Sequence, residues 1–253
     1  MVTGAARGIG LATAKRFLAD DWRVALLDIE GEQLERAVAA LKQPDQTLAL
    51  TCDVSDAKAV NTAFEQIAGR FGRLDALVNN AGVAVFAPLL ETSETDWNRI
   101  LSVNLTGPFL CTKAAAALMR EHGGGAVVNI TSISAVRAST LRSAYGTSKA
   151  GLAHLTKQLA VELASLGIRV NGVAPGPVDT AMAKAVHTPE IRADYHDAIP
   201  LNRYGLEEEL AEAIFFLCSD RASYITGQIL AVDGGFDAAG IGLPTLRGQR
   251  RNG

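Results

Sequence analysis

The sequence predicts a doubly wound α/β fold, a parallel sheet with helices on both faces, on three observations. Short apolar runs alternate with longer helical patterns along the chain. A glycine-rich turn, Thr3-Gly-Ala-Ala-Arg-Gly-Ile-Gly10, opens the chain and leads into a helical pattern. Polar residues follow several of the apolar runs, at the sheet edge where such folds bind ligands. We therefore expect one domain over residues 1–253, with no internal boundary.

The strand candidates are nearly continuous apolar runs, which is typical of strands buried on both faces of a parallel sheet. Together with the short run before Thr3, they predict a sheet of about seven strands. These candidates are Arg23–Leu27, Leu48–Cys52, Ala76–Val78, Ala126–Ile130, Arg169–Val173 and Ile229–Val232.

Helical patterns fill the segments between these strands. After the second strand, Leu34, Val38 and Leu41 recur at spacings of four and three, which places them on one helical face. Alternation of strands and helices favours right-handed crossovers between parallel strands. The expected helices span Gly8–Asp20, Glu32–Lys42, Ala57–Phe71, Thr95–Glu121, Ala144–Ser165 and Glu207–Cys218.

The first strand is predicted to be truncated. Only Met1 and Val2 precede Thr3, whereas a strand normally has about five residues. A charged amino terminus near the sheet core is costly. Either the natural chain begins upstream with an apolar run, or the strand is simply short. The intact mass of protein from the native organism distinguishes the two.

Composition excludes several classes of function. The formal charge is −3, and no Lys/Arg run stands out before the tail, so we expect no nucleic-acid partner. No apolar stretch is long enough to span a bilayer, and the start of the chain has no secretory pattern. The cysteines are odd in number and far apart, which favours buried thiols in a cytoplasmic protein. Without CxxC, HExxH or a carboxylate–histidine cluster, we expect no catalytic metal.

The glycine turn and the second strand together indicate a dinucleotide. Gly4 permits a tight turn, while Gly8 and Gly10 let the backbone and the next helix approach a pyrophosphate. Asp28 ends the second strand, where a carboxylate can accept hydrogen bonds from both ribose hydroxyls and would repel a 2′-phosphate. Arg7 favours that phosphate instead. The repulsion between a 2′-phosphate and the facing Asp28 carboxylate should exceed the attraction of that phosphate to one exposed arginine. We therefore expect NAD in preference to NADP. A plain cap or turn role for Asp28 is the alternative.

Polar residues also follow the third and fourth strands. Asp53 can accept a hydrogen bond from an adenine amino group, or it can cap the helix that starts near Ser55, and both interpretations stay open. The run Asn79-Asn-Ala-Gly82 has small residues that leave room for a cofactor. Asn79 by itself can equally be a turn stabiliser.

A second group of residues can move a proton. Tyr145 and Lys149 are four residues apart, on one helical face. A tyrosine titrates near ~10, and a nearby ammonium lowers its pKa by favouring the phenolate. Ser132 follows a strand and can hold a substrate oxygen, with Ser134 as a competitor for that role. Asn104 lies in a helical stretch, where asparagine is disfavoured, so we expect it to serve a water or the lysine. A Tyr/Lys pair alone is more often a surface contact; the combination favours catalysis.

These motifs resemble the short-chain dehydrogenase/reductase family in its compact, single-domain Rossmann form. The resemblance covers the chain from Thr3 to about Gly235 and is specific in combination. The family patterns TGxxxGxG and NNAG, its Pro-Gly segment after the sixth strand and two late segments match Thr3–Gly10, Asn79–Gly82, Pro175-Gly176, Tyr224-Ile-Thr-Gly-Gln and Val232-Asp-Gly-Gly.

The resemblance implies roles for individual residues. Tyr145 is the general acid in reduction and the base in oxidation, and Lys149 lowers its pKa and holds the nicotinamide ribose. Ser132, selected over Ser134 by its spacing from the tyrosine, positions the substrate oxygen, and Asn104 supports a proton relay through water. The implied cofactor contacts are Gly4, Arg7, Gly8, Ile9, Gly10, Asp28, Asp53, Val54, Asn80, Ala81, Gly82, Tyr145, Lys149, Pro175, Gly176, Val178 and Thr180. Family members are commonly tetramers, so we expect a homotetramer.

Two late segments are expected to differ from the common pattern. Residues 181–203 are polar and helical in pattern, broken at Pro189 and Pro200, and we expect them to cover the substrate. This polar lid favours a sugar, polyol or hydroxy acid. It carries His187, Tyr195 and His196. A histidine there can bind a polyol or an acid, although a lone histidine is more often a solvated surface residue. Residues 236–253 form a C-terminal extension, in which Ile241, Leu243 and Leu246 can pack across a subunit interface and residues 248–253 are expected to fray.

The predicted function is hydride transfer between NAD(H) and a secondary alcohol or ketone. A rival enzyme is a 3-oxoacyl-thioester reductase using NADPH, which the segment 199–235 also resembles; Asp28 disfavours it. A rival of another class is a dinucleotide sensor without chemistry, which has no need of Tyr145 and Lys149.

Overall fold

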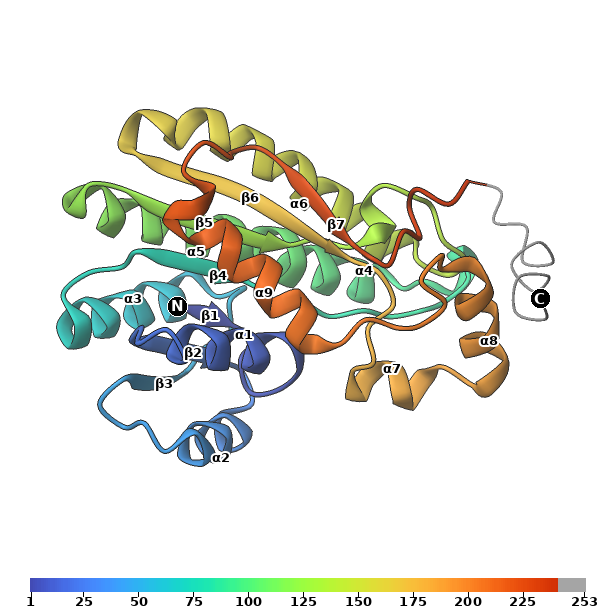
Figure 1. Cartoon of the computed structure of the whole chain (residues 1–253), viewed down its shortest axis with the longest axis horizontal. Coiled ribbons are helices and arrows are strands. Elements are labelled where there is room, and N and C mark those ends of the chain that lie inside the picture. The colour runs from blue at the N-terminus through green and yellow to red at the C-terminus, as the bar shows by residue number, and fades with distance from the viewer. Residues whose placement is uncertain (241–253) are drawn as a thin grey trace, which may run out of the picture.

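The computed structural model describes residues 1–240, apart from the side chains of Met182 and Ala185, and within them seven parallel strands form one sheet (Figure 1). The strands are β1 (Val2–Thr3), β2 (Val24–Asp28), β3 (Thr47–Thr51), β4 (Ala76–Asn79), β5 (Gly125–Ile130), β6 (Ile168–Pro175) and β7 (Ile229–Val232). Their order across the sheet is β3-β2-β1-β4-β5-β6-β7. The order reverses between β1 and β4, and a doubly wound sheet binds its ligand at the carboxyl ends of the strands beside that reversal.

The predicted fold class is confirmed, and most helices lie where the patterns placed them. They are α1 (Gly8–Leu18), α2 (Gly31–Leu41), α3 (Ala57–Phe71), α4 (Glu94–Leu101), α5 (Gly107–Met119), α6 (Ser143–Leu163), α7 (Ala181–Val186), α8 (Pro189–Ala198) and α9 (Glu207–Cys218). Short 3-10 turns lie at Leu89–Glu91, Arg120–His122, Ile133–Ala135, Ala164–Leu166 and Asp220–Ala222. The single helix expected over 95–121 is divided by a π-helical turn, Ser102–Thr106.

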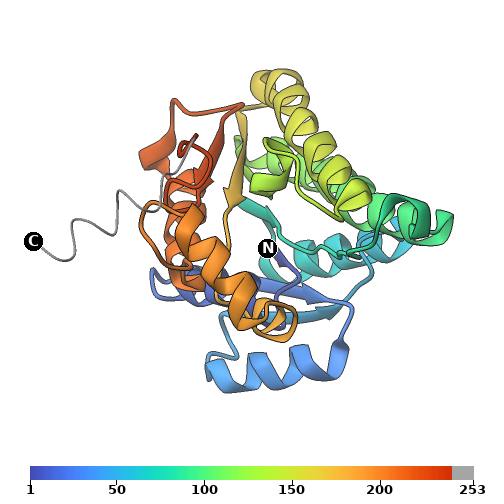
Figure 2. The same ribbon diagram turned by 90° about the vertical axis from the view of Figure 1, so that its right-hand side faces the viewer.

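The sheet separates two apolar cores. Successive strand residues point to opposite faces, so Leu26 packs with α1, α2 and α9, whereas Ala25 and Leu27 pack with α3 and α5. Figure 2 shows α9 on one side of the sheet and the helices of the middle of the chain on the other. Both faces are covered, which is why the strands are apolar along nearly their whole length.

The glycine turn after β1 is a close-packed joint. Gly4 has φ +62°, and a Cβ there would lie 2.8 Å from the Cα of Ala81; a Cβ on Gly10 would lie 2.2 Å from the Gly4 carbonyl oxygen. The Asn80 amide donates to the carbonyl oxygens of Thr3 and Gly4, each at 2.9 Å. The Thr3 hydroxyl accepts from the backbone nitrogens of Asn80 and Ala81, each at 3.0 Å. Only glycine fits this approach of the turn to the end of β4.

The truncated first strand is confirmed. β1 pairs Val2 with Leu26 and with Val78, while the neighbouring strands each begin two residues earlier in register, at Val24 and Ala76. The Met1 nitrogen donates to the Ala76 carbonyl oxygen at 2.9 Å. A cavity of about 990 Å³ opens beside Met1 at this amino edge of the sheet.

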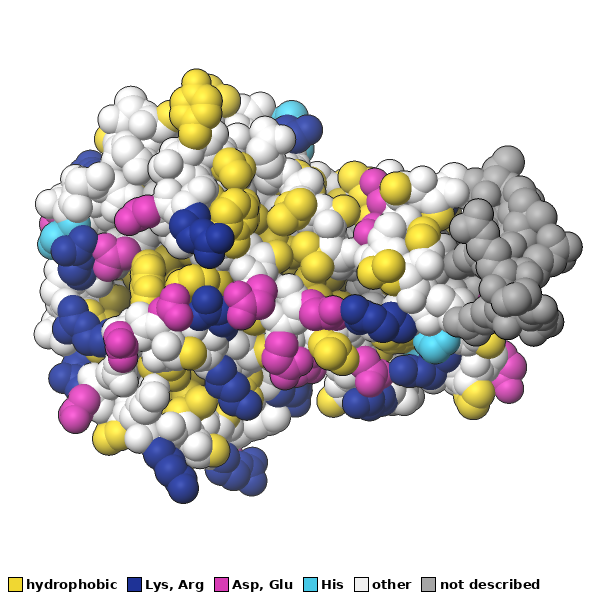
Figure 3. Space-filling view, in the orientation of Figure 1, with side chains coloured by type: hydrophobic (Ala, Val, Ile, Leu, Met, Phe, Trp, Pro, Cys, Tyr) yellow, Lys and Arg dark blue, Asp and Glu magenta, His cyan; other side chains and the backbone are white. Residues whose placement is uncertain are grey.

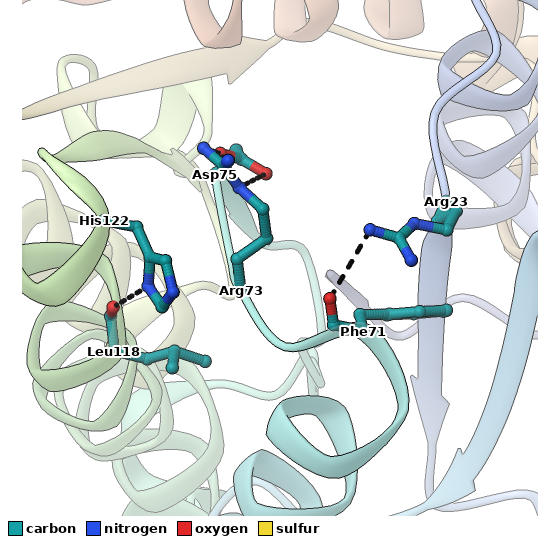
Figure 4. Close-up of polar contacts among 6 residues, drawn as sticks. All are labelled: Arg23, Phe71, Arg73, Asp75, Leu118 and His122. Atoms are coloured by element: carbon teal, nitrogen blue, oxygen red, sulfur yellow. Dashed lines mark hydrogen bonds and ion pairs between the residues drawn. The ribbon is translucent and has the colours of Figure 1, made fainter.

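Three polar side chains on the wall of that cavity make local contacts (Figure 4). Arg73 pairs with Asp75 at 2.6 Å, Arg23 donates to the Phe71 carbonyl oxygen at 3.4 Å, and the His122 Nδ1 lies 3.1 Å from the Leu118 carbonyl oxygen. None of the predicted catalytic or cofactor residues is among those lining it. The functional site therefore belongs at the opposite, carboxyl edge.

The surface and the helices carry two further observations. On the face shown in Figure 3, basic and acidic side chains are interspersed rather than gathered by sign. In the part of the chain that the structure describes, no helix is long and apolar enough to cross a membrane.

Candidate active site

A cavity of about 580 Å³ lies at the carboxyl ends of the central strands. Its wall comes from the glycine turn, the segment after β4, the end of β5, the start of α6, the loop after β6 and the lid helices. The structure thus brings together many of the residues predicted from motifs far apart in the chain. The predicted residues that line it are Arg7, Gly8, Ile9, Asn80, Gly82, Ser132, Tyr145, Lys149, Pro175, Gly176, Val178 and Thr180.

Other predicted residues do not line this cavity. Gly4, Gly10 and Ala81 form the joint described above, and Asn104 lies behind the wall. Asp28, Asp53 and Val54 follow β2 and β3 and lie outside the cavity itself. Contacts of these three with a cofactor therefore stay predictions.

Asp28 joins β2 to the glycine turn. One carboxylate oxygen accepts from the Ala6 backbone nitrogen at 3.0 Å, and the other accepts from the Glu30 backbone nitrogen at 3.1 Å. The cap position of α2 is Glu30, so Asp28 stabilises a turn without capping the helix. A carboxylate accepts about four hydrogen bonds, and two remain for a ligand. Arg7 is exposed and donates to the Gln33 side-chain oxygen at 2.9 Å, which holds it near the start of α2.

The capping interpretation of Asp53 is wrong. Asp53 accepts from the backbone nitrogen and the hydroxyl of Ser55, at 2.9 and 2.7 Å, and so stabilises a local turn. The cap of α3 is Asp56, whose carboxylate accepts from the backbone nitrogens of Lys58 and Ala59. Val54, between them, is buried against Gly107, where a Cβ would lie 2.8 Å from a Val54 methyl group.

Asn79 is a strand residue, and its interpretation as a turn stabiliser is wrong. Its buried amide donates to the Thr112 hydroxyl at 3.1 Å and to the Asn129 side-chain oxygen at 2.8 Å. Asn129 donates in turn to the Thr156 hydroxyl at 2.9 Å. Buried amides need partners, and this row satisfies them by joining α5, β4, β5 and α6 beneath the site.

The predicted proton-transfer group is assembled on the wall of the cavity. Burial raises the pKa of the Tyr145 hydroxyl, and two effects oppose that rise: a hydrogen bond with the Ser132 side chain and the charge of Arg142. Lys149 lies with its ammonium 5.9 Å from the centre of the Tyr145 ring and donates to the Ile130 carbonyl oxygen at 2.7 Å. Lys149 was expected to lower the pKa of Tyr145, but the groups that lower it are Ser132 and Arg142. Burial lowers the pKa of Lys149 itself to about 8.

The two candidate serines have different surroundings. Ser132 bonds to Tyr145, and its hydroxyl also accepts from the Ser134 backbone nitrogen at 3.1 Å. The Ser134 hydroxyl instead accepts from the Arg142 guanidinium at 3.3 Å. Of the two, only Ser132 contacts the tyrosine.

Asn104 lies in the π-helical turn, which explains an asparagine inside a helical stretch. Its side chain is fully buried. It accepts from the Val83 backbone nitrogen at 2.8 Å and donates to the Val83 carbonyl oxygen at 2.9 Å and the Ser148 hydroxyl at 3.0 Å. A π-turn widens a helix by one residue and is frequent at functional sites, and here it turns the amide toward the segment after β4.

Replacing Asn104 with Ala is expected to destabilise the protein by about 1–3 kcal/mol, because both backbone groups of Val83 lose their partner in a partly buried place. For a domain of this size the melting temperature should fall by roughly 2–4 °C per kcal/mol. Asn98, exposed on α4, gives the matched variant Asn98→Ala, which should melt like the wild type. Equal melting temperatures for the two variants would contradict this role of Asn104.

Aromatic residues of the predicted lid, 181–203, form a cluster with Tyr204. His187 is half-buried on the cavity wall, and this position favours contact with a ligand over the role of a plain surface residue. Its Nδ1 lies 3.0 Å from the Tyr204 hydroxyl, and its ring is 5.3 Å from that of Tyr195. Burial, Arg142 and Arg192 all lower its pKa, which favours the neutral ring. His196 packs edge-on against Tyr204, at 5.6 Å.

The wall residues that were not predicted include Phe86, Arg142 and Phe236. Arg142 could have been predicted from the sequence, because it lies three residues before Tyr145, one helical turn away. Phe236 belongs to the C-terminal extension, and its carbonyl oxygen accepts from Arg137. Ile241, Leu243 and Leu246 lie outside the described residues, and their interface role stays a prediction.

Residues 4–237 match the family model described as Enoyl-(Acyl carrier protein) reductase. The chain is 42% identical over 240 residues to cis-4-hydroxycyclohexanecarboxylate dehydrogenase of Sinomonas cyclohexanicum, covering 94% of this chain and 96% of that one. The chain belongs to the short-chain dehydrogenase/reductase family. The predicted resemblance is confirmed.

Other relatives in this short-chain dehydrogenase/reductase family have different names. The chain is 41% identical to D-threitol dehydrogenase of Mycolicibacterium smegmatis, covering 93% of this chain and 91% of the relative. It is 38% identical to a 3-oxoacyl-(acyl-carrier-protein) reductase of Thermotoga maritima, covering 93% and 96%. The crystal structure of levodione reductase superimposes with a TM-score of 0.89 at 35% identity, covering 94% and 96%. The protein is therefore an NAD(P)-dependent oxidoreductase that acts on CH–OH groups.

The residues present fit such a dinucleotide. A Cβ on Gly8, φ +62°, would meet only the Glu207 carboxylate, at 3.8 Å, so the space at the start of α1 is open. The cap residue Arg7 makes no side-chain hydrogen bond to the first turn of α1, so the helix start is available to a pyrophosphate. When bound, the dinucleotide accepts or supplies a hydride. Among residues 1–240, no three His, Cys, Asp or Glu side chains gather as a metal site.

Proposed function

We propose that this enzyme interconverts a secondary alcohol and a ketone with NAD(H), on a substrate of the sugar, polyol or hydroxy-acid kind. The observation that carries the proposal is the convergence of Tyr145, Ser132 and Lys149 on one cavity that also borders the glycine turn. The names of relatives support this substrate range, because they include a dehydrogenase of a hydroxycarboxylate and one of a polyol.

Each residue of the proposed site has its own role in the reaction. Ser132 holds the substrate oxygen beside Tyr145, and Tyr145 takes the hydroxyl proton in oxidation and returns it in reduction. Lys149, one turn along α6, supplies a cationic group beside Tyr145 and binds the nicotinamide ribose. Asn104 holds the Val83 backbone and supports a proton path through water. The lid, residues 181–203, closes over the substrate and excludes solvent.

Asp28 supports NAD as the preferred cofactor. It ends β2 beside the glycine turn, and its carboxylate keeps capacity for two hydroxyl donors. A 2′-phosphate at the same place would face this negative charge. Arg7, held by Gln33, is the one feature of the turn that favours the phosphate.

The variant Asp28→Ala is expected to relax the preference for NADH over NADPH by tenfold or more, about 1.4 kcal/mol. The measurement is fluorescence titration of both cofactors at equal ionic strength, since charge–phosphate interactions depend on salt. Arg7→Ala should act in the opposite direction and weaken NADPH alone. Selectivity unchanged in Asp28→Ala would refute the role of Asp28.

A second candidate is reduction of a 3-oxoacyl thioester with NADPH. The relatives of 38–40% identity that bear this name favour it. Asp28 argues against it through the cofactor. Tighter binding of NADPH than NADH to the wild type would move this candidate to first place. The sensor without chemistry has no support, because the relatives above are named as enzymes.

We propose a cytoplasmic homotetramer with small-molecule partners and without nucleic-acid or membrane partners. Exposed apolar side chains support two interfaces. Phe109 and Val161 lie on α5 and α6, and Tyr224 and Leu230 lie on or beside β7, the edge strand. Uncovered apolar side chains at two separate places are typical of a subunit that meets its copies twice.

A further inference from the structure

The charged residues of the active-site cavity are of one sign. Its wall carries Arg7, Arg142 and Lys149, and no Asp or Glu is among the residues that line it. His187 is also on the wall, and its lowered pKa favours the neutral ring. Arg7 belongs to the glycine turn and therefore to the cofactor. Lys149 donates to the Ile130 carbonyl oxygen beside Tyr145. Arg142 belongs to neither the glycine turn nor the predicted Tyr145, Lys149 and Ser132 group, although its charge lowers the pKa of Tyr145.

Arg142 is held in place by neutral groups only. Its guanidinium donates to the Ser134 hydroxyl at 3.3 Å and to the Tyr195 hydroxyl at 3.2 Å, and it lies 4.8 Å from the centre of the Phe86 ring. None of the ion pairs found within residues 1–240 includes it. Arg192 on the same lid differs, because it pairs with Asp179 at 2.7 Å. A guanidinium has five donors, so three of those on Arg142 remain.

The position of Arg142 links the reacting end of the cavity to the lid. It directly precedes α6, one turn before Tyr145, and its charge acts on both Tyr145 and His187. Its hydrogen bond to Tyr195 reaches α8. A group bound by Arg142 therefore lies between the catalytic hydroxyl and the cover of the site.

We propose that Arg142 binds a carboxylate of the substrate, so that the enzyme oxidises hydroxycarboxylates and reduces the corresponding oxocarboxylates. The inference rests on the proposed function and narrows its substrate class. The planar fork of a guanidinium matches a carboxylate with two parallel hydrogen bonds, whereas a polyol would leave the buried side of this charge without a counter-charge. In the oxidation, the alcohol carbon loses a hydride to the bound dinucleotide and the hydroxyl proton goes to Tyr145, while the carboxylate is unchanged.

Calorimetric titration of the NAD-loaded enzyme tests the proposal without turnover. The probes are acetate, propionate and cyclohexanecarboxylate, each against its own amide, which has the same shape without the charge. We expect at least one acid to bind ten times more tightly than its amide, and Arg142→Met to abolish the difference. Arg142→Lys should keep part of it. The matched control is Arg99→Met, which removes an exposed arginine on α4 and should leave the difference intact. If no acid binds more tightly than its amide, the proposal is overturned.

Kinetics separate this proposal from the proposed function. With cis-4-hydroxycyclohexanecarboxylate and other hydroxy acids against their amides, Arg142→Met should raise KM for the acids tenfold or more and change the amides little. It should also move the oxidation profile to higher pH, because Arg142 lowers the pKa of Tyr145. A residue that only supports the fold would affect acid and amide alike. Turnover of amides as fast as acids overturns the carboxylate site alone; absence of turnover for every alcohol overturns the proposed function, while the titration still decides on Arg142.

Discussion

The variant Tyr145→Phe is expected to lower kcat by about 10²–10⁴ while cofactor binding changes less than twofold. The phenylalanine ring keeps the packing against Phe86, whose ring centre lies 6.4 Å away, and removes only the hydroxyl that bonds with Ser132. The measurement is single-turnover oxidation together with NADH titration. Persisting turnover would show that another group moves the proton.

The direction of the pH dependence follows from the same hydroxyl. Oxidation needs Tyr145 deprotonated, and burial raises its pKa, so the rate of oxidation should rise with pH across the alkaline range while the rate of reduction falls. Tyr145→Phe should lose this limb. The control Tyr224→Phe removes only a hydroxyl from a ring outside the active-site cavity, keeps the apolar ring at the proposed interface, and should keep both the rate and the profile.

The variant Lys149→Met is expected to lower kcat by about 10²–10⁴, because the cationic group of the proton-transfer set is lost. Lys149 is 4% exposed and donates to the Ile130 carbonyl oxygen at 2.7 Å, so the variant also leaves that oxygen without its partner. We expect KM for the cofactor to rise as well. Lys157, exposed two turns further along α6, gives the control Lys157→Met, which should behave as the wild type.

The pH dependence of protein stability gives a second test of Lys149. Its pKa falls from 10.5 to about 8 on folding, so between these values the unfolded chain binds a proton that the folded protein has released. This group therefore contributes stability that increases as the pH rises through that window, by up to about 3 kcal/mol. Lys149→Met should be most favourable relative to the wild type near pH 7.5 and lose that advantage by pH 10.5. A difference in melting temperature that is constant with pH would contradict this shift.

The motifs with local meaning were predictable in detail. The glycine turn was predictable because Gly4 and Gly10 lie closer to neighbouring backbone than a Cβ would allow, so only glycine can occupy these positions. The pair Tyr145 and Lys149 follows from helical periodicity. Asp53 and Asn79 were not predictable, because each has two plausible uses and only the neighbours decide: Ser55 for the first, Thr112 and Asn129 for the second.

By itself, the sequence determined the doubly wound sheet and its short first strand, and it supplied the set of residues proposed for the chemistry. Hydrophobic periodicity and glycine placement are local properties, and a single chain displays them. The tertiary structure alone decided that Asn104 lies in a π-turn and that Arg142 stands without a counter-charge near Tyr145. Both features depend on which distant segments of the chain meet. The burial of a side chain and the charge around it are set by neighbours from the whole fold, and no single stretch of sequence shows those neighbours.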